Sequence, residues 1–250
     1  SGLICSLGLN TLWLYILYRG AVVAMIPGRA LNALVMIFVQ ALCFVFCGRV
    51  FKTQTDRLLM ERKSALRREA RSYCLKNKDK LPELSVSVEE GLLSLPEYAE
   101  AQTVFCYCST ELEIDTDGII NNALESGKLV CVPLCGENRT MTARLIRSLE
   151  DVKEGRFGLR EPSADAPLVN RESIDLAVVP ALMCSRGFER LGNAGGYYDR
   201  YFENSDILRA ALCREALLKN RLPSAAHDVK MDIVVTESAV LRREEKERGV

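Results

Sequence analysis

The sequence predicts an α/β protein built around a mostly parallel β-sheet. Short apolar runs rich in β-branched residues are typical of buried strands, and three of them cover residues 103–108, 128–133 and 175–180. A helix is expected between the first two runs, because Asp115 or Thr116 can cap its start and Gly127 can end it. A strand, a helix and a second strand at this spacing indicate a βαβ unit, whose two strands run parallel.

The same patterns predict the other elements of the sheet and its helices. Asp56 is expected to cap a helix that runs to about residue 78. A second helix is predicted over residues 86–95, before Pro96. Residues 155–162 have the composition of a polar turn. Further strands are predicted at residues 141–146, 207–213 and 231–236.

Residues 1–53 form a hydrophobic extension that differs from the rest of the chain. Two almost continuously apolar stretches, 3–18 and 31–48, lie before the first acidic residue, Asp56. The second stretch has about the minimum length for crossing a bilayer. Three interpretations compete: a membrane anchor, an organellar presequence, and translated sequence outside the working protein. We expect residues 54–243 to form the functional domain and residues 244–250 a charged tail.

Composition excludes several classes of function. The 33 basic and 33 acidic residues cancel, so the chain has no general basic field and we expect no nucleic-acid partner. The ten cysteines have no paired CxxC spacing, which favours small core residues in a reducing compartment over disulfides or a zinc site. His227 is the single histidine, so a histidine-rich metal centre is excluded.

The most informative stretch is a glycine-rich loop at residues 190–201, between a predicted strand and a predicted helix. Its glycines fall at positions 192, 195 and 196. A glycine loop that leads into a helix lets backbone N–H groups approach an anion closely. Arg190 and Arg200 add positive charge, and Asp199 could hold a divalent cation. A simple turn is the alternative, since one glycine cluster alone is a weak signal.

Two further features are compatible with a ligand site. Lys63, Arg67 and Arg71 recur every four residues, so they share one face of the first predicted helix and repel one another unless an anion lies opposite. Glu113 follows a predicted strand, at the edge of an α/β sheet where ligands usually bind. The alternatives are a solvated charged face and a loop carboxylate in water.

Five ordered segments together resemble the family of 5-formyltetrahydrofolate cyclo-ligase, also called 5,10-methenyltetrahydrofolate synthetase. The resemblance covers about residues 56–243 and is far more specific than any single motif. It implies a three-layer α/β/α structure similar to the NagB/RpiA/CoA-transferase-like fold, and a monomer. The segments are Lys63-Ser-Ala-Leu-Arg67, Ser109–Thr116, Phe157-Gly-Leu-Arg-Glu-Pro162, Arg190-Leu-Gly-Asn-Ala-Gly-Gly-Tyr-Tyr-Asp-Arg200, and His227-Asp-Val-Lys-Met-Asp232 with Val234-Val-Thr-Glu237.

The resemblance implies an activity that depends on ATP and Mg²⁺. The substrate would be 5-formyltetrahydrofolate, including polyglutamylated forms. Its formyl oxygen would attack the γ-phosphate of ATP to form a phosphorylated imidate, and ring closure would give 5,10-methenyltetrahydrofolate. Phosphoryl transfer requires charge neutralisation and alignment more than an enzymic nucleophile. The chain fits this requirement, because it contains no convincing Ser/His/Asp or Cys/His arrangement.

The resemblance also implies roles for individual residues. Arg190 and Tyr198 would be catalytic, and Asp199 and Asp232 would hold the metal. ATP would be bound by Lys63, Arg67, Arg190, Gly192, Gly195, Gly196 and Tyr198. The folate would be bound by Cys108, Glu113, Asn193, Ala194, Gly195, Gly196 and Tyr197.

The glycine-rich loop departs from the family pattern at two positions. Asn193 stands where many members have a larger residue, and Ala194 replaces a glycine. If position 194 needs a positive φ, the alanine is strained. These departures leave a non-catalytic folate- or nucleotide-binding relative as the main alternative, and a sugar-phosphate isomerase or CoA-transferase-like enzyme as another. We expect a cytoplasmic protein, or a mitochondrial or other organellar one if the extension is a presequence.

Overall fold

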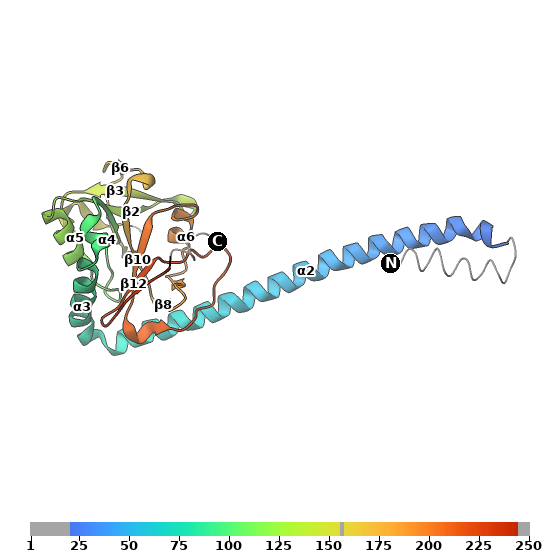
Figure 1. The fold of residues 1–250 in the computed structure, drawn as a ribbon, viewed down its shortest axis with the longest axis horizontal. Helices are drawn as coiled ribbons and strands as arrows, with labels where there is room; N and C mark the ends of the chain where they lie inside the picture. Colours follow the sequence, from blue (N-terminus) through green and yellow to red (C-terminus); the bar gives the residue numbers. More distant parts are fainter. Residues whose placement is uncertain (1–20, 156–157, 245–250) are drawn as a thin grey trace. The chain divides into compact units, whose positions relative to one another are not determined.

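The computed structural model describes residues 21–155 and 158–244, and the side chains of its first helix from residue 35 onward. The chain divides into two compact units, Ser1–Leu58 and Leu59–Val250. Helix α2 (Ala21–Lys76) includes residues of both units (Figure 1). The prediction that a helix begins at Asp56 was wrong, because Asp56 lies inside α2. Residues 49–55 contain no Gly or Pro that would end the helix before it.

The larger unit is organised around one sheet, whose strands follow the order β13-β12-β10-β7-β1-β2-β3-β6. Strands β12, β10, β7, β1 and β2 run parallel, and antiparallel strands complete both edges. The predicted mostly parallel sheet is therefore confirmed. The strands are β1 (Thr103–Cys106), β2 (Leu129–Cys135), β3 (Met141–Ile146), β6 (Leu168–Val169), β7 (Leu176–Pro180), β10 (Leu208–Leu212), β12 (Ile233–Val235) and β13 (Val240–Arg242).

The predicted βαβ unit consists of β1, helix α5 (Asp117–Glu125) and β2. Thr116 precedes α5 as expected, but its hydroxyl donates a 2.7 Å hydrogen bond to the carbonyl of Tyr107 and does not cap the helix. Gly127 has a φ of 76°, which glycine adopts without strain, and the chain turns there into β2.

Three layers enclose two hydrophobic cores, one on each face of the sheet (Figure 1). Helices α3 (Leu81–Leu93), α4 (Pro96–Glu100) and α5 cover one face, which buries Val104 and Val178. Successive side chains of a strand point to opposite faces, so Phe105 and Val179 lie in the other core. The last turns of α2, helix α6 (Tyr197–Tyr201) and a small second sheet cover that face.

Short elements complete the fold. Helix α3 starts at Leu81, earlier than predicted, since Pro82 is favoured in a first helical turn. Residues 155–162 are not only a turn, because β5 pairs there with β4. These strands are β4 (Val152–Glu154) and β5 (Arg160–Pro162), and the second sheet contains β8 (Met183–Ser185), β9 (Arg190–Leu191) and β11 (Leu218–Lys219). Single 3-10 turns occupy Lys78–Lys80, Glu137–Arg139, Leu149–Asp151, Arg171–Ser173 and Glu215–Leu217.

Two leucines in the sheet test this core. Leu176 is completely buried in β7, whereas Leu168 in β6 is 60% exposed. We expect Leu176→Ala to lower the free energy of unfolding by about 2–5 kcal/mol, since it leaves a cavity. Leu168→Ala should change it by no more than about 0.5 kcal/mol. Urea denaturation followed by circular dichroism measures both, and equal effects would contradict the assigned register.

Candidate functional site

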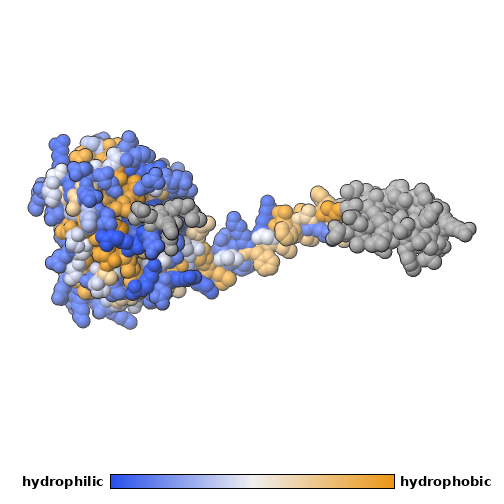
Figure 2. Space-filling view, viewed as in Figure 1, coloured by the Kyte–Doolittle hydropathy of each residue, from blue (hydrophilic) through white to orange (hydrophobic). Residues whose placement is uncertain are grey.

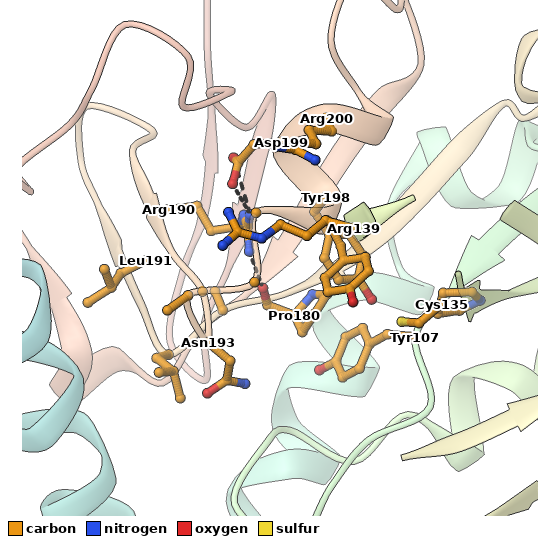
Figure 3. Close-up of a pocket in the computed structure, with 18 of the residues that line it drawn as sticks. Tyr107, Cys135, Arg139, Pro180, Arg190, Leu191, Asn193, Tyr198, Asp199 and Arg200 are labelled. Carbon is orange, nitrogen blue, oxygen red and sulfur yellow. Dashed lines mark hydrogen bonds and ion pairs between the residues drawn. The ribbon is translucent and has the colours of Figure 1, made fainter. Parts of the chain in front are cut away.

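A cavity of about 1060 Å³ lies at the carboxyl ends of the central parallel strands, within the unit Leu59–Val250 (Figure 3). Tyr107 follows β1, Pro133 and Cys135 lie near the end of β2, and Pro180 ends β7. Thirteen of the fourteen predicted site residues line this cavity, and Asp232 is the exception. The thirteen are Lys63, Arg67, Cys108, Glu113, Arg190, Gly192, Asn193, Ala194, Gly195, Gly196, Tyr197, Tyr198 and Asp199.

The glycine-rich loop has no room for side chains at two of its glycines. A Cβ atom at Gly192 would lie 2.5 Å from Nη1 of Arg190. At Gly195 it would lie 2.6 Å from the ring of Tyr197. Gly196 has a φ of 67° and directly precedes α6. The loop is therefore closely packed on its own side chains, and its bare backbone lines the cavity.

Ala194 adopts a φ of 78°, so the strained conformation considered for this position is present. The side chain of its neighbour Asn193 makes two hydrogen bonds that a glycine at this position could not make. The Asn193 side chain accepts a 3.2 Å hydrogen bond from Nη2 of Arg71 and donates one of 3.2 Å to Oε1 of Glu113. The loop is thereby tied to both α2 and the segment after β1.

Cationic side chains of α2 form one wall of the cavity. Nε of Arg67 donates a 2.8 Å hydrogen bond to the carbonyl of Gly192. Burial lowers the pKa of Arg67, and the positive charge of Arg71 lowers it further. Lys63 pairs with the carboxylate of Asp228. Burial is the largest single influence on the pKa of Asp228 and would raise it, but the hydrogen bonds from Lys63 and the backbone of Ala225, with the charge of Lys63, together hold the pKa below its ordinary value.

Arg190 is fixed from several directions, as Figure 3 shows. Its Nη1 donates to the carbonyl of Pro180 at 3.0 Å, and its Nη2 lies 3.3 Å from Oδ1 of Asp199. The guanidinium also lies over the ring of Tyr198, 5.5 Å from its centroid. Within the described part of the chain, the buried Nε of Arg190 has no hydrogen-bond partner.

Two other cavity residues stay protonated at neutral pH. Burial raises the pKa of Tyr198 well above its usual value, and the nearby charge of Glu113 raises it further, so the phenol remains a hydrogen-bond donor. Burial raises the pKa of Cys108 to about 11. A neutral thiol is a poor nucleophile, which leaves Cys108 as part of the cavity wall.

Comparisons with known proteins decide the family. A family model described as the 5-formyltetrahydrofolate cyclo-ligase family matches residues 53–237. The chain belongs to this family. A probable 5-formyltetrahydrofolate cyclo-ligase from Caenorhabditis elegans is 27% identical, over 73% of this chain and 96% of the relative. The mitochondrial 5-formyltetrahydrofolate cyclo-ligase of Arabidopsis thaliana is 25% identical, over 62% of this chain and 66% of the relative.

Solved structures agree with this placement among the cyclo-ligases. A 5,10-methenyltetrahydrofolate synthetase from Aquifex aeolicus superposes with a TM-score of 0.65 at 29% identity, covering 72% of this chain and 92% of the other. One from Mycoplasma pneumoniae superposes with a TM-score of 0.56 at 16% identity, covering 70% and 98%, and supports the fold alone. The narrower similarity to the NagB/RpiA/CoA-transferase-like fold stays a prediction.

In this cyclo-ligase, Asp232 does not reach the cavity, so the expected metal pair of Asp199 and Asp232 does not fit the structure. The Asp232 carboxylate is 3% exposed and accepts hydrogen bonds from Nε and the backbone N–H of Arg209, at 2.8 and 3.0 Å. Arg243 lies 3.7 Å away. Asp232 directly precedes the buried strand β12, and its carboxylate therefore joins two elements of the fold.

Asp228 is the carboxylate from the same motif that lines the cavity. The next residue, Val229, donates its backbone N–H to Oδ1 of Asp199 at 3.3 Å, so the loop that carries Asp228 touches Asp199 directly. Sequence reasoning missed Asp228 because the motif 227–232 contains two aspartates. Only the position of the strand tells which of them faces the cavity.

Sequence reasoning also missed two arginine contacts that shape the cavity of the cyclo-ligase. Arg160 donates two hydrogen bonds, of 2.9 and 2.6 Å, to Asp117 at the start of α5. Arg214 is 3% exposed and donates to the carbonyl of Glu113 and to Oγ of Ser85, both at 3.2 Å. Arg160 belongs to the segment 157–162 that the resemblance includes, but Arg214 lies outside every motif.

Replacement of the strained alanine tests the loop geometry. We expect Ala194→Gly to raise the free energy of unfolding by about 0.5–1 kcal/mol, because a φ of 78° costs alanine more than glycine. Turnover should be preserved or increased. The matched control is Ala65→Gly on the exposed face of α2, which should destabilise by about 1 kcal/mol. Thermal unfolding distinguishes the opposite signs, and a loss of stability in both variants would contradict the strain.

Proposed function

We propose that this cyclo-ligase family enzyme cyclises 5-formyltetrahydrofolate to 5,10-methenyltetrahydrofolate, with conversion of ATP to ADP and phosphate in the presence of Mg²⁺. The observation that carries the proposal is one cavity in which a cationic helix face and a glycine-rich loop stand beside Glu113 and three tyrosines. Such a cavity offers one part suited to phosphates and another suited to a flat, hydrogen-bonding ring system.

The phosphate part would consist of Lys63, Arg67, Arg190 and the loop backbone. Arg67 already contacts the loop through Nε, and its guanidinium carries further N–H donors for phosphate oxygens. Arg190 lines the same cavity and adds a second guanidinium. Charges fixed before the ligand arrives stabilise the transferring phosphoryl group without reorganisation.

The folate part would consist of Glu113, Asn193, Ala194, Gly195, Gly196, Tyr197 and the wall residue Cys108. Glu113 is held in place, since its Oε2 accepts two 3.0 Å hydrogen bonds from the backbone and hydroxyl of Thr110. Its Oε1 faces Asn193 and can exchange that contact for a ring N–H donor. Tyr197 offers an aromatic face beside the loop.

The formyl oxygen is a poor leaving group, and its phosphorylation would turn it into a good one. The formyl oxygen attacks the γ-phosphorus as the bond to ADP breaks, which converts the formyl group into a phosphorylated imidate. The N10 lone pair then attacks the formyl carbon, the carbon–oxygen bond breaks, and phosphate departs as N10 loses its proton. Arg190 would neutralise the transferred charge, and the protonated Tyr198 would donate a hydrogen bond to it.

Asp199 and Asp228 are the residues we propose for Mg²⁺. Mg²⁺ prefers hard oxygen ligands, commonly one or two carboxylates together with phosphates and retained waters. Both aspartates line the cavity, and the Val229 N–H links their two segments. Bound Mg²⁺ would supply charge neutralisation at the phosphates. Asp232 is not proposed, because it is enclosed by Arg209 and Arg243.

The deciding experiment uses the full chain in mild detergent, with 5-formyltetrahydrofolate and Mg²⁺, with and without ATP. Growth of the near-ultraviolet absorbance of the methenyl product only with ATP is the expected result. Saturable binding of folate or ATP without product would instead favour the non-catalytic relative. We also propose that the enzyme acts as a monomer in the cytoplasm and that it accepts polyglutamylated substrates.

Arg67 and its neighbour Arg68 form a matched pair for the nucleotide site. Arg67 lines the cavity, whereas Arg68 is exposed and donates a 3.1 Å hydrogen bond to Oγ of Ser64, also on α2. We expect Arg67→Ala to raise the KM for ATP by roughly 10- to 100-fold, the worth of a hydrogen bond from a charged group. Arg68→Ala should leave it unchanged. Steady-state kinetics over ATP concentration measures both, and an unchanged KM in Arg67→Ala would refute its role.

The three aspartates test the metal assignment. We expect Asp199→Asn and Asp228→Asn to raise the Mg²⁺ concentration for half-maximal turnover at least about 10-fold, since each removes a hard anionic ligand. Asp232→Asn should leave the Mg²⁺ dependence unchanged and lower the free energy of unfolding by about 3–5 kcal/mol, because it leaves buried arginine charge unpaired. Mg²⁺ titrations and denaturation distinguish the two patterns. A shifted Mg²⁺ dependence in Asp199→Asn and Asp232→Asn, with none in Asp228→Asn, would restore the original pair.

A further inference from the structure

The described part of α2 before residue 59 carries large apolar side chains on its surface (Figure 2). Every residue from 35 to 58 is exposed. The five consecutive residues Val35, Met36, Ile37, Phe38 and Val39 are 51%, 55%, 46%, 71% and 42% exposed. An apolar surface of this kind marks a site of interaction with another protein or a membrane.

The distribution of these side chains around the helix distinguishes a lipid bilayer from a protein partner. Each residue advances about 100° around an α-helix, so five consecutive apolar residues cover every direction. Residues 41–47 continue this apolar surface, and Leu42, Phe44, Val45 and Phe46 among them are 62%, 82%, 51% and 67% exposed. A groove on a protein partner covers one face of a helix, whereas a lipid bilayer covers all of them.

The length of the apolar segment and its lack of charged residues fit a helix that crosses a bilayer. Arg29 and Arg49 bracket residues 30–48, which contain no Asp, Glu, Lys or Arg. As part of α2, these 19 residues extend about 28 Å, close to the roughly 30 Å thickness of a bilayer's hydrocarbon core. By length and composition, the described segment Val35–Lys76 contains a stretch able to cross a membrane.

We propose that residues 30–48 span a lipid bilayer and anchor the enzyme to it. Flanking charge assigns the orientation, because Lys and Arg are retained on the cytoplasmic side. Residues 49–68 contain seven Lys or Arg residues, and residues 10–29 contain two, Arg19 and Arg29. The domain that carries the cavity therefore faces the cytoplasm. A presequence would be amphipathic, whereas this segment is apolar on all sides.

The test uses the full chain with a C-terminal tag, expressed in cells. We expect the chain at full length in the membrane fraction after alkaline carbonate extraction, with the tag digested by protease added to the cytoplasmic side of sealed vesicles. Release by carbonate, a soluble full-length chain or removal of the N-terminal segment would each overturn the anchor. A protected tag would overturn the orientation.

A matched pair of variants distinguishes insertion of the segment into the membrane from nonspecific adsorption of an apolar surface. Val39→Lys with Leu42→Lys places two charges near the middle of the segment, where each should lower insertion roughly 100-fold. The control is Leu58→Lys, since Leu58 is 58% exposed, close to the 62% of Leu42, but lies outside residues 30–48. The double variant should leave the membrane fraction and the control should remain in it. The reverse, or no difference, would overturn the proposal, whatever the catalytic activity.

Discussion

The parallel alignment of the central strands is the constraint on which the site depends. Strands β1, β2 and β7 run in the same direction, so the chain leaves the sheet at the same edge after each of them. The hydrophobic cores on both faces fix this alignment, because a slip of one residue would exchange Phe105 and Val104 between the two cores. Segments far apart in sequence, such as those of Glu113 and Asn193, therefore meet at one cavity.

Paired charges then hold the cavity walls. Three ion pairs each join two different elements, and they are Lys63–Asp228, Arg190–Asp199 and Arg160–Asp117. Without these partners the cationic side chains would repel one another. If the charged side chains came together only when a ligand binds, their reorganisation would cost free energy. The pairs make the cationic wall compatible with a folded protein.

The loop substitutions at positions 193 and 194 have a structural explanation as well as a cost. Ala194 retains the positive φ that a glycine would adopt more easily. Asn193 adds hydrogen bonds to Arg71 and Glu113, which anchor the loop to its two neighbours. The strain at Ala194 is thus accompanied by side-chain hydrogen bonds that hold Asn193 to both neighbours.

The sequence by itself determined the fold class and the family, and thirteen of the fourteen site residues that it predicted line the cavity. These features depend on local patterns, namely β-branched runs, a glycine-rich loop and helical spacing of charges, and such patterns survive in the order of the residues. Tertiary structure decided which of Asp228 and Asp232 reaches the cavity, since that depends on where β12 begins and on which arginines enclose it. It also decided the bridges made by Asn193 and Arg214. Their partners lie 80 and 101 residues away along the chain at Glu113, and no local pattern specifies a contact at that separation.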